Sequence, residues 1–61
     1  MFNTNTSRVR VGDVVSVDGK PRQIIAKQKA FSAPEYFITF MINNQEVTRV
    51  YHSNKKFMVV A

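Results

Sequence analysis

The chain has 61 residues, carries nine Lys and Arg against four Asp and Glu, and contains no cysteine. A chain this short forms one domain at most and buries only about 60% of its unfolded surface, and without cysteine it has no disulfide bonds and no thiolate metal sites. The net charge of +5 favours acidic partners, among which nucleic acid is the commonest, because each neutralised phosphate also releases a counterion. The same charge also fits the simpler role of keeping a small domain soluble.

The sequence shows no membrane or export signal. No uninterrupted apolar run approaches the roughly 20 residues of a membrane helix. The opening residues, Met-Phe-Asn-Thr-Asn-Thr-Ser, have neither the basic flank nor the apolar centre of a signal peptide. We therefore expect a cytoplasmic protein without membrane contact.

The amino-terminal part is expected to be a loose arm followed by a strand. Residues 1–7 are mostly Asn, Thr and Ser, with Phe2 as a candidate anchor. The alternation from Arg8 to Val11 predicts a strand with its valines on one face and its arginines on the other. Gly12 and Asp13 interrupt the pattern as a turn or bulge, after which Val14–Val17 continues it.

The stretch Asp18-Gly19-Lys20-Pro21 is the clearest turn in the chain. A two-residue loop would place Val15 opposite Arg22, whereas a four-residue loop over 18–21 would place it opposite Ile24 and keep Pro21 out of the ladder. We therefore predict the longer loop.

The returning strand is predicted over residues 22–29. Its alternation places Ile24 and Ala26 on one face and Lys27 and Lys29 on the other. The connection over 30–35 that follows carries an isolated ring, Phe31, which we expect to cap the core rather than to contact a ligand.

The central element is predicted at Tyr36–Ile42, which is aromatic, β-branched and apolar at both even and odd positions. Asn43-Asn44 tolerates the positive φ of a tight hairpin turn, so Gln45–His52 should return antiparallel beside it. With a two-residue loop, the register places the even-numbered side chains of the central strand in the core. Phe37 then lies on the opposite face, for which the sequence leaves both burial and exposure open.

A short last strand is predicted at residues 57–60, after a turn at 53–56. Five short strands without an amphipathic helix predict an all-β fold: a strongly bent, antiparallel SH3-like barrel over residues 8–61.

The stretch from Val11 to Pro21, followed by Ile24–Lys27, resembles SH3-like barrels of the KOW type, including the amino-terminal domain of elongation factor P. The resemblance implies the barrel fold and partners such as RNA, ribosomes or polymerase-associated proteins. It covers a third to a half of the chain. The lysine-bearing glycine loop of elongation factor P has no counterpart, because residues 27–32 contain no glycine.

Catalytic groups are scarce. His52 is the only histidine, and its predicted neighbour across the hairpin is Glu35. No nucleophile accompanies this pair, which is better explained as a solvated cross-strand contact. No spacing indicates zinc or calcium, and two glycines do not form a phosphate loop. We expect a non-enzyme that uses no cofactor and no metal.

The remaining signal is a set of cations interleaved with rings, the pairing that single-stranded nucleic-acid binders use to follow phosphates and stack bases. The competing interpretation is that the rings build the core and the cations are solvated. The candidate phosphate contacts are Arg8, Arg10, Lys27, Lys29 and Arg49, and the candidate stacking rings are Tyr36, Phe37 and Tyr51.

Two functions therefore stay open: a small basic protein that binds RNA or DNA, and a protein-interaction module or inhibitor that docks on an acidic surface of a larger partner. A homodimer that shares one sheet is a variant of the second function.

Overall fold

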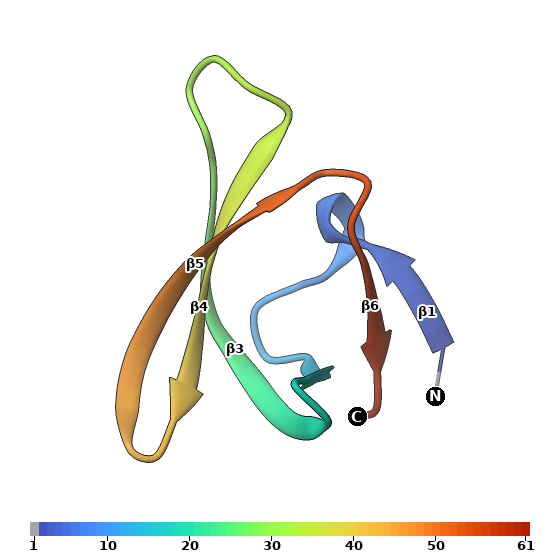
Figure 1. Cartoon of the computed structure of the whole chain (residues 1–61), viewed down its shortest axis with the longest axis vertical. Coiled ribbons are helices and arrows are strands. Elements are labelled where there is room, and N and C mark those ends of the chain that lie inside the picture. Colours follow the sequence, from blue (N-terminus) through green and yellow to red (C-terminus); the bar gives the residue numbers. More distant parts are fainter. Residues whose placement is uncertain (1) are drawn as a thin grey trace.

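The computed structural model describes residues 2–61, which form one antiparallel sheet of six strands (Figure 1). The order across the sheet is β1-β6-β2-β3-β4-β5. The elements are β1 (Phe2–Asn5), a 3-10 helix (Thr6–Arg8), β2 (Val14–Val17), β3 (Lys20–Lys29), β4 (Glu35–Ile42), β5 (Gln45–His52) and β6 (Lys56–Val59). The all-β, antiparallel prediction is confirmed. The predicted five-stranded barrel is corrected, because a sixth strand is present and the sheet does not close between β1 and β5.

The amino-terminal segment differs from the expected loose arm. Residues 2–5 pair with β6 in a register that sets Phe2 opposite Val59. Thr6 is fully buried, and both its backbone N–H and its Oγ1 donate to the Lys55 carbonyl at 2.8 Å. The polar composition suggested a solvated arm, but backbone pairing and one buried hydroxyl hold it to the sheet instead. Met1 lies outside the described residues.

The strand predicted from Arg8 to Val11 is absent. Val9 is buried, but Val11 is exposed, so the alternation does not mark one sheet face. The Asp13 carboxylate accepts from the Arg10 backbone N–H at 2.9 Å, and the Asp13 N–H donates to the Arg10 carbonyl at 3.0 Å. These local bonds make a tight turn of the segment and remove Val11 from the core.

The turn between β2 and β3 has two residues rather than the predicted four. Asp18 and Gly19 have φ of 55° and 79°, the positive values of the hairpin turn whose twist matches the flanking strands. Val15 lies opposite Arg22 and Ser16 opposite Pro21. The pair next to the turn exchanges hydrogen bonds and the following pair does not. Pro21 therefore occupies a position where no N–H is needed, which removes the argument against the short loop.

A β-bulge in β3 reverses the predicted alternation. Ile24 pairs with Phe40, but Ala26 pairs with Thr39, so the residue between them has no partner. After the bulge Lys27 lies on the core side of the sheet, opposite Ile38. The prediction that Ala26 shares a face with Ile24 is therefore wrong, because Ala26 lies on the outer side with Thr39 and Lys27 lies on the side of Ile24.

The β4–β5 hairpin agrees with the predictions. Its bounds include the predicted central strand, and Asn43 and Asn44 adopt φ of 51° and 63°. All predicted cross-strand pairs are present, including Phe40 with Val47 and Phe37 with Val50. Phe40 and Ile38 are fully buried, as predicted for the even side chains.

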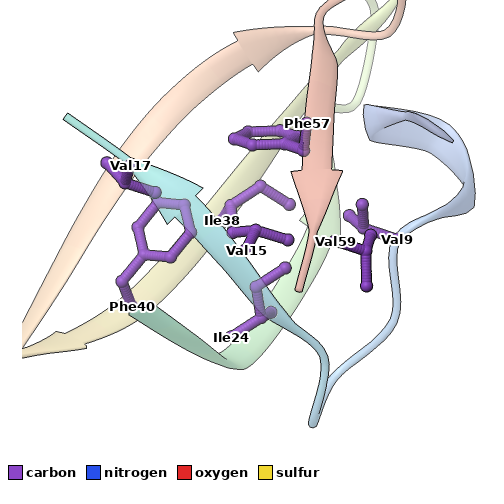
Figure 2. Packing of buried hydrophobic residues seen from close by; sticks show 8 residues of the cluster. All are labelled: Val9, Val15, Val17, Ile24, Ile38, Phe40, Phe57 and Val59. Carbon is purple, nitrogen blue, oxygen red and sulfur yellow. The ribbon is translucent and has the colours of Figure 1, made fainter. Parts of the chain in front are cut away.

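The core lies between two halves of the strongly curved sheet, β1–β6–β2 and β3–β4–β5 (Figure 2). Side chains from both halves and from the segment before β2 point into the same space. The buried apolar residues are Val9, Val15, Val17, Ile24, Ile38, Phe40, Phe57 and Val59. The prediction that Phe31 caps this core is wrong, because its side chain is fully exposed in the loop that projects beyond β3 and β4 (Figure 1).

Candidate nucleic-acid interface

The open side of the sheet contains a hollow of about 190 Å³ between β5 and the ends of β2 and β6. No strand pairing joins β5 to either of them, but the rings of Tyr51 and Phe57 meet edge to face at 4.9 Å across this gap. We call this region the seam. It is lined by Ser16, Val17, Asp18, Arg49, Tyr51, Lys55, Lys56 and Phe57.

Three cations gather at the seam. Arg49 comes from β5, whereas Lys55 and Lys56 come from the turn before β6 and its first residue. We call these three residues the seam cluster. Its position follows from the β5 register: Arg49 shares the inner face of the hairpin with Ile38, at the margin where the core meets solvent.

Arg49 is oriented by a contact that crosses the seam. Its Nη1 lies 3.3 Å from Oδ2 of Asp18, in the β2–β3 turn. Tyr51 and then Asp18 raise the pKa of Arg49 above its ordinary value, because both stabilise the charged form. The guanidinium is therefore charged at every accessible pH. A pair this exposed contributes little to stability, so its main effect is on side-chain direction.

The turn that carries the two lysines is held on both sides. The Lys55 carbonyl accepts the two bonds from Thr6, and the Lys55 N–H donates to the His52 carbonyl at 2.9 Å. The Lys55 ammonium lies 5.9 Å from the centre of the Phe57 ring, within the range of a cation–π contact. Both lysine side chains are exposed while their backbone is fixed, so the charges are presented from a rigid base.

Arg8 and Arg10 lie elsewhere, beside a second hollow of about 340 Å³ that also contacts Phe2, Thr4 and Asp13. Both arginines are exposed. They line this hollow together although the strand predicted for them is absent, and Arg49 is not part of that site.

Lys27 is engaged in the fold. Its ammonium donates to the carbonyls of Ser7 at 2.9 Å and Val9 at 2.8 Å, and lies 4.7 Å from the centre of the Tyr36 ring. Burial lowers the pKa of Lys27, against a smaller opposite effect of Asp13. Three contacts occupy the ammonium, so this lysine fixes the segment before β2 and is not free to contact a phosphate. Lys29, opposite Tyr36, is exposed.

Phe37 lies on the other face of the sheet. We call this the outer face; on β4 and β5 it carries Glu35, Phe37, Thr39, Met41, Glu46, Thr48, Val50 and His52. The Phe37 side chain is 40% exposed and borders a shallow hollow of about 450 Å³ between β3 and β5. None of the outer-face residues of β4 and β5 is Lys or Arg. Lys27 also borders this hollow, but its ammonium is bonded to backbone carbonyls before β2.

Of the eight candidate residues, only Arg49 and Tyr51 line the seam. Arg8 and Arg10 line the second hollow, and Lys27 and Phe37 border the hollow on the outer face. Sequence reasoning left out Lys55 and Lys56, although a pair of adjacent lysines in a turn was the signal available. It also left out Asp18 and Phe57, because their proximity depends on how the sheet curves.

Within residues 2–61 no three His, Asp or Glu side chains lie close enough to share a metal ion. The same residues include no helix with the length and apolar character needed to cross a membrane. Comparison with known proteins found no matching family model, no similar curated sequence and no similar solved structure. The resemblance to KOW-type barrels, and the expectation of a cytoplasmic non-enzyme, stay predictions.

Proposed function

We propose that the protein binds single-stranded nucleic acid at the seam, with the seam cluster contacting phosphates and Tyr51 beside it as the base-contacting ring. The observation that carries this proposal is the seam itself, where cations and rings from two separate parts of the chain, β5 and residues 55–57, surround one hollow. The other candidate cations contribute no side chain to this hollow.

The charge balance at the seam supports an anionic ligand. Three cations face one carboxylate, that of Asp18, which leaves a local excess of two positive charges. Arg49 also keeps guanidinium donors beyond the single nitrogen that contacts Asp18. A phosphate oxygen near these groups would be neutralised by fixed charges, and its counterion would be released.

The rings at the seam favour a single strand over a duplex. Tyr51 is partly exposed, whereas Phe57 and Phe40 behind it are buried and hold it at centroid distances of 4.9 and 6.1 Å. A ring supported in this way is suited to base stacking, which contributes roughly 1 to 3 kcal/mol per base. Bases of a duplex are already stacked on one another and do not offer their faces.

Fluorescence anisotropy with labelled single-stranded DNA, single-stranded RNA and duplex DNA tests this proposal over a series of salt concentrations. We expect tighter binding to the single strands, with log affinity falling linearly as log salt rises by about 0.7 per phosphate contact. Binding that is absent at low salt, or that does not change with salt, would overturn the proposal.

A matched pair of double variants locates the site. Lys55→Gln with Lys56→Gln removes two seam charges, and Arg8→Gln with Arg10→Gln removes the same number at the second hollow. We expect the first pair to lower the salt slope by about 1.4, at roughly 0.7 per lost contact, and the second to change affinity far less. Equal losses would mean that net charge, rather than the seam, binds the ligand.

The other function, docking on an acidic protein surface, would use the same cations. It predicts a complex that survives nuclease treatment, whereas the nucleic-acid proposal predicts release of bound material on nuclease digestion.

A further inference from the structure

The free side of β5 has the properties of a pairing edge. β5 is the last strand of the sheet and pairs only with β4. Among the backbone hydrogen bonds of the described residues outside the strand ladders, none involves residues 45–51. An eight-residue strand with unpaired backbone groups is a template for another strand unless it is blocked.

The register shows which residues carry the free groups. Gln45 and Ile42 flank the two-residue turn, so they form a hydrogen-bonded pair, and pairs of this kind then alternate along the hairpin. The β2–β3 hairpin obeys the same rule, since the Ile24 N–H donates to the Asp13 carbonyl at 2.9 Å while the neighbouring Val14 bonds on its other side. The outward backbone groups of β5 therefore belong to Glu46, Thr48, Val50 and His52, of which the His52 carbonyl already accepts from the Lys55 N–H at 2.9 Å.

These four residues also have their side chains on the outer face. The inner face holds the cations of the seam, whereas the outer-face residues of β4 and β5 include no Lys or Arg. Two copies of a chain with net charge +5 repel one another less across the outer face than across the inner face, which carries Arg49. Val50 on the edge strand is 51% exposed and Met41 on the neighbouring strand β4 is 38% exposed, so pairing would join the apolar parts of the two outer faces.

We propose that the occupant of this edge is a second copy of the chain, paired antiparallel through β5 about a two-fold axis at Arg49. This register keeps the outer faces of both copies on the same side and uses the full strand from residue 46 to residue 52. It sets Glu46 opposite the partner's His52 and Thr48 opposite the partner's Val50. The proposal rests on the free edge of β5 and not on nucleic-acid binding, although Arg49 belongs to both sites.

The register is self-complementary in hydrogen bonding at its two ends. The His52 Nδ1 accepts from the Asn54 backbone N–H at 3.0 Å, so the hydrogen of the neutral ring lies on Nε2. That N–H is free to donate to a carboxylate, and the two-fold axis brings the partner's Glu46 opposite it, once at each end. Glu35, which faces His52 within the chain, is the other carboxylate near this ring.

One contact opposes this register, because Arg49 lies opposite the partner's Arg49. Each guanidinium is directed to its own Asp18 at 3.3 Å, which reduces the repulsion. Registers displaced by two residues separate the arginines, but they lose both contacts between Glu46 and the partner's His52.

Sedimentation equilibrium and amide hydrogen exchange test the pairing together. As the concentration rises from micromolar to millimolar, we expect the mass to approach twice that of the monomer. Over the same range the amides of residues 46, 48, 50 and 52 should become protected, while those of 47, 49 and 51 are protected at every concentration. A monomer at millimolar concentration, or a dimer in which the four amides exchange freely, would overturn the proposal.

Charge variants test the register. Glu46→Lys places two lysines opposite two histidines, and His52→Glu places two glutamates opposite two glutamates, so each variant alone should be monomeric. An equal mixture should dimerise, since the introduced lysine of one variant meets the introduced glutamate of the other. Failure of the mixture, when both variants retain the β-sheet circular dichroism spectrum, would exclude this register.

Backbone variants at Val50 separate edge pairing from packing of the outer faces. Val50→Pro removes an N–H that is not bonded to β4, and Val50→Thr retains it with a similar shape. Only the proline variant should lose the dimer. If it does not fold, the hydrogen-exchange result for the unmodified chain still decides the question.

Discussion

The two faces of the β4–β5 hairpin differ in chemistry although the same 16 residues supply both of them. The inner face runs from the core residues Ile38 and Phe40 to Arg49 at the seam. The outer face is partly apolar and has no Lys or Arg. Because strand side chains alternate, one hairpin can serve as the wall of a core, as part of a cationic site and as an outer face without cations. The contrast teaches that the overall charge of this protein is not spread evenly, and the following predictions test it.

The largest effect is expected at Phe40, which is fully buried and whose ring centroid lies 6.1 and 6.3 Å from those of Tyr51 and Phe57. Phe40→Ala should cost about 3 to 5 kcal/mol, because a large cavity forms. A domain this small has little stability to lose, so we expect an unfolded chain at 25 °C by circular dichroism. The matched outer-face variant, Phe37→Ala, should lose less than about 1 kcal/mol in urea titration, as surface substitutions do. Equal losses would show that both faces are covered.

Lys27→Met should destabilise the fold by about 1 to 2 kcal/mol, since the bonds to the Ser7 and Val9 carbonyls come from a charged donor. Lys29→Met, at the exposed end of the same strand, is the control and should change stability by less than about 0.5 kcal/mol. Urea titration measures both. An unchanged free energy of unfolding in Lys27→Met would mean that this lysine is available for ligand binding. It would then not differ in role from the cations of the seam cluster.

The pH dependence of the same lysine has a definite sign. Burial lowers its pKa in the folded state below the ordinary 10.5, so the unfolded chain holds this proton more tightly. The part of the stability that arises from this pKa shift is fully present above pH 10.5 and is lost as pH falls through the lowered folded pKa. The two hydrogen bonds of the charged ammonium contribute below that pKa as well. The stability difference between the unmodified chain and Lys27→Met should therefore grow as pH rises toward 10.5. A difference that is constant or shrinks would contradict burial as the cause.

The hydroxyls of Thr39 and Thr48 make the polar cross-strand contact of the outer face, at 2.8 Å. Thr39→Val should cost about 1 kcal/mol, the usual net value of one hydrogen bond. The double variant with Thr48→Val should cost less than the sum of the two single variants, which a double-mutant cycle in urea measures. Additive losses would show that the hydroxyls act independently through solvent.

The smallest effect is expected at Asp18, whose carboxylate is the one negative group at the seam. Asp18→Asn tolerates the φ of 55° and should leave the urea midpoint unchanged. Affinity for single-stranded DNA at low salt should rise by roughly twofold, which is the effect expected from removing one solvent-screened negative charge. Weaker binding would mean that Asp18 is needed to orient Arg49.

Local signals were sufficient where turn chemistry and strand alternation agreed. The β4–β5 hairpin was predictable, because Asn43-Asn44 accepts positive φ and only one register places like with like. The β2–β3 turn was mispredicted for a specific reason. The sequence argument counted Pro21 in the ladder and the pairing of Val15 with Arg22 against the short loop. In the structure Pro21 occupies a position where no ladder hydrogen bond forms, and Val15 is buried because it packs in the core between the two halves of the sheet.

The sequence by itself determined the all-β class, the excess of positive charge, and the division of the β4–β5 hairpin into a core face and an outer face. These properties depend on residue type and on an alternation of two. Tertiary structure alone decided that residues 2–5 are a strand, that the bulge after Ile24 directs Lys27 inward, and that Arg49 meets Lys55 and Lys56 at an open seam. The direction of Lys27 depends on the register between β3 and β4, and the other two features depend on how far the sheet curves. Both are set by packing between segments distant in the chain.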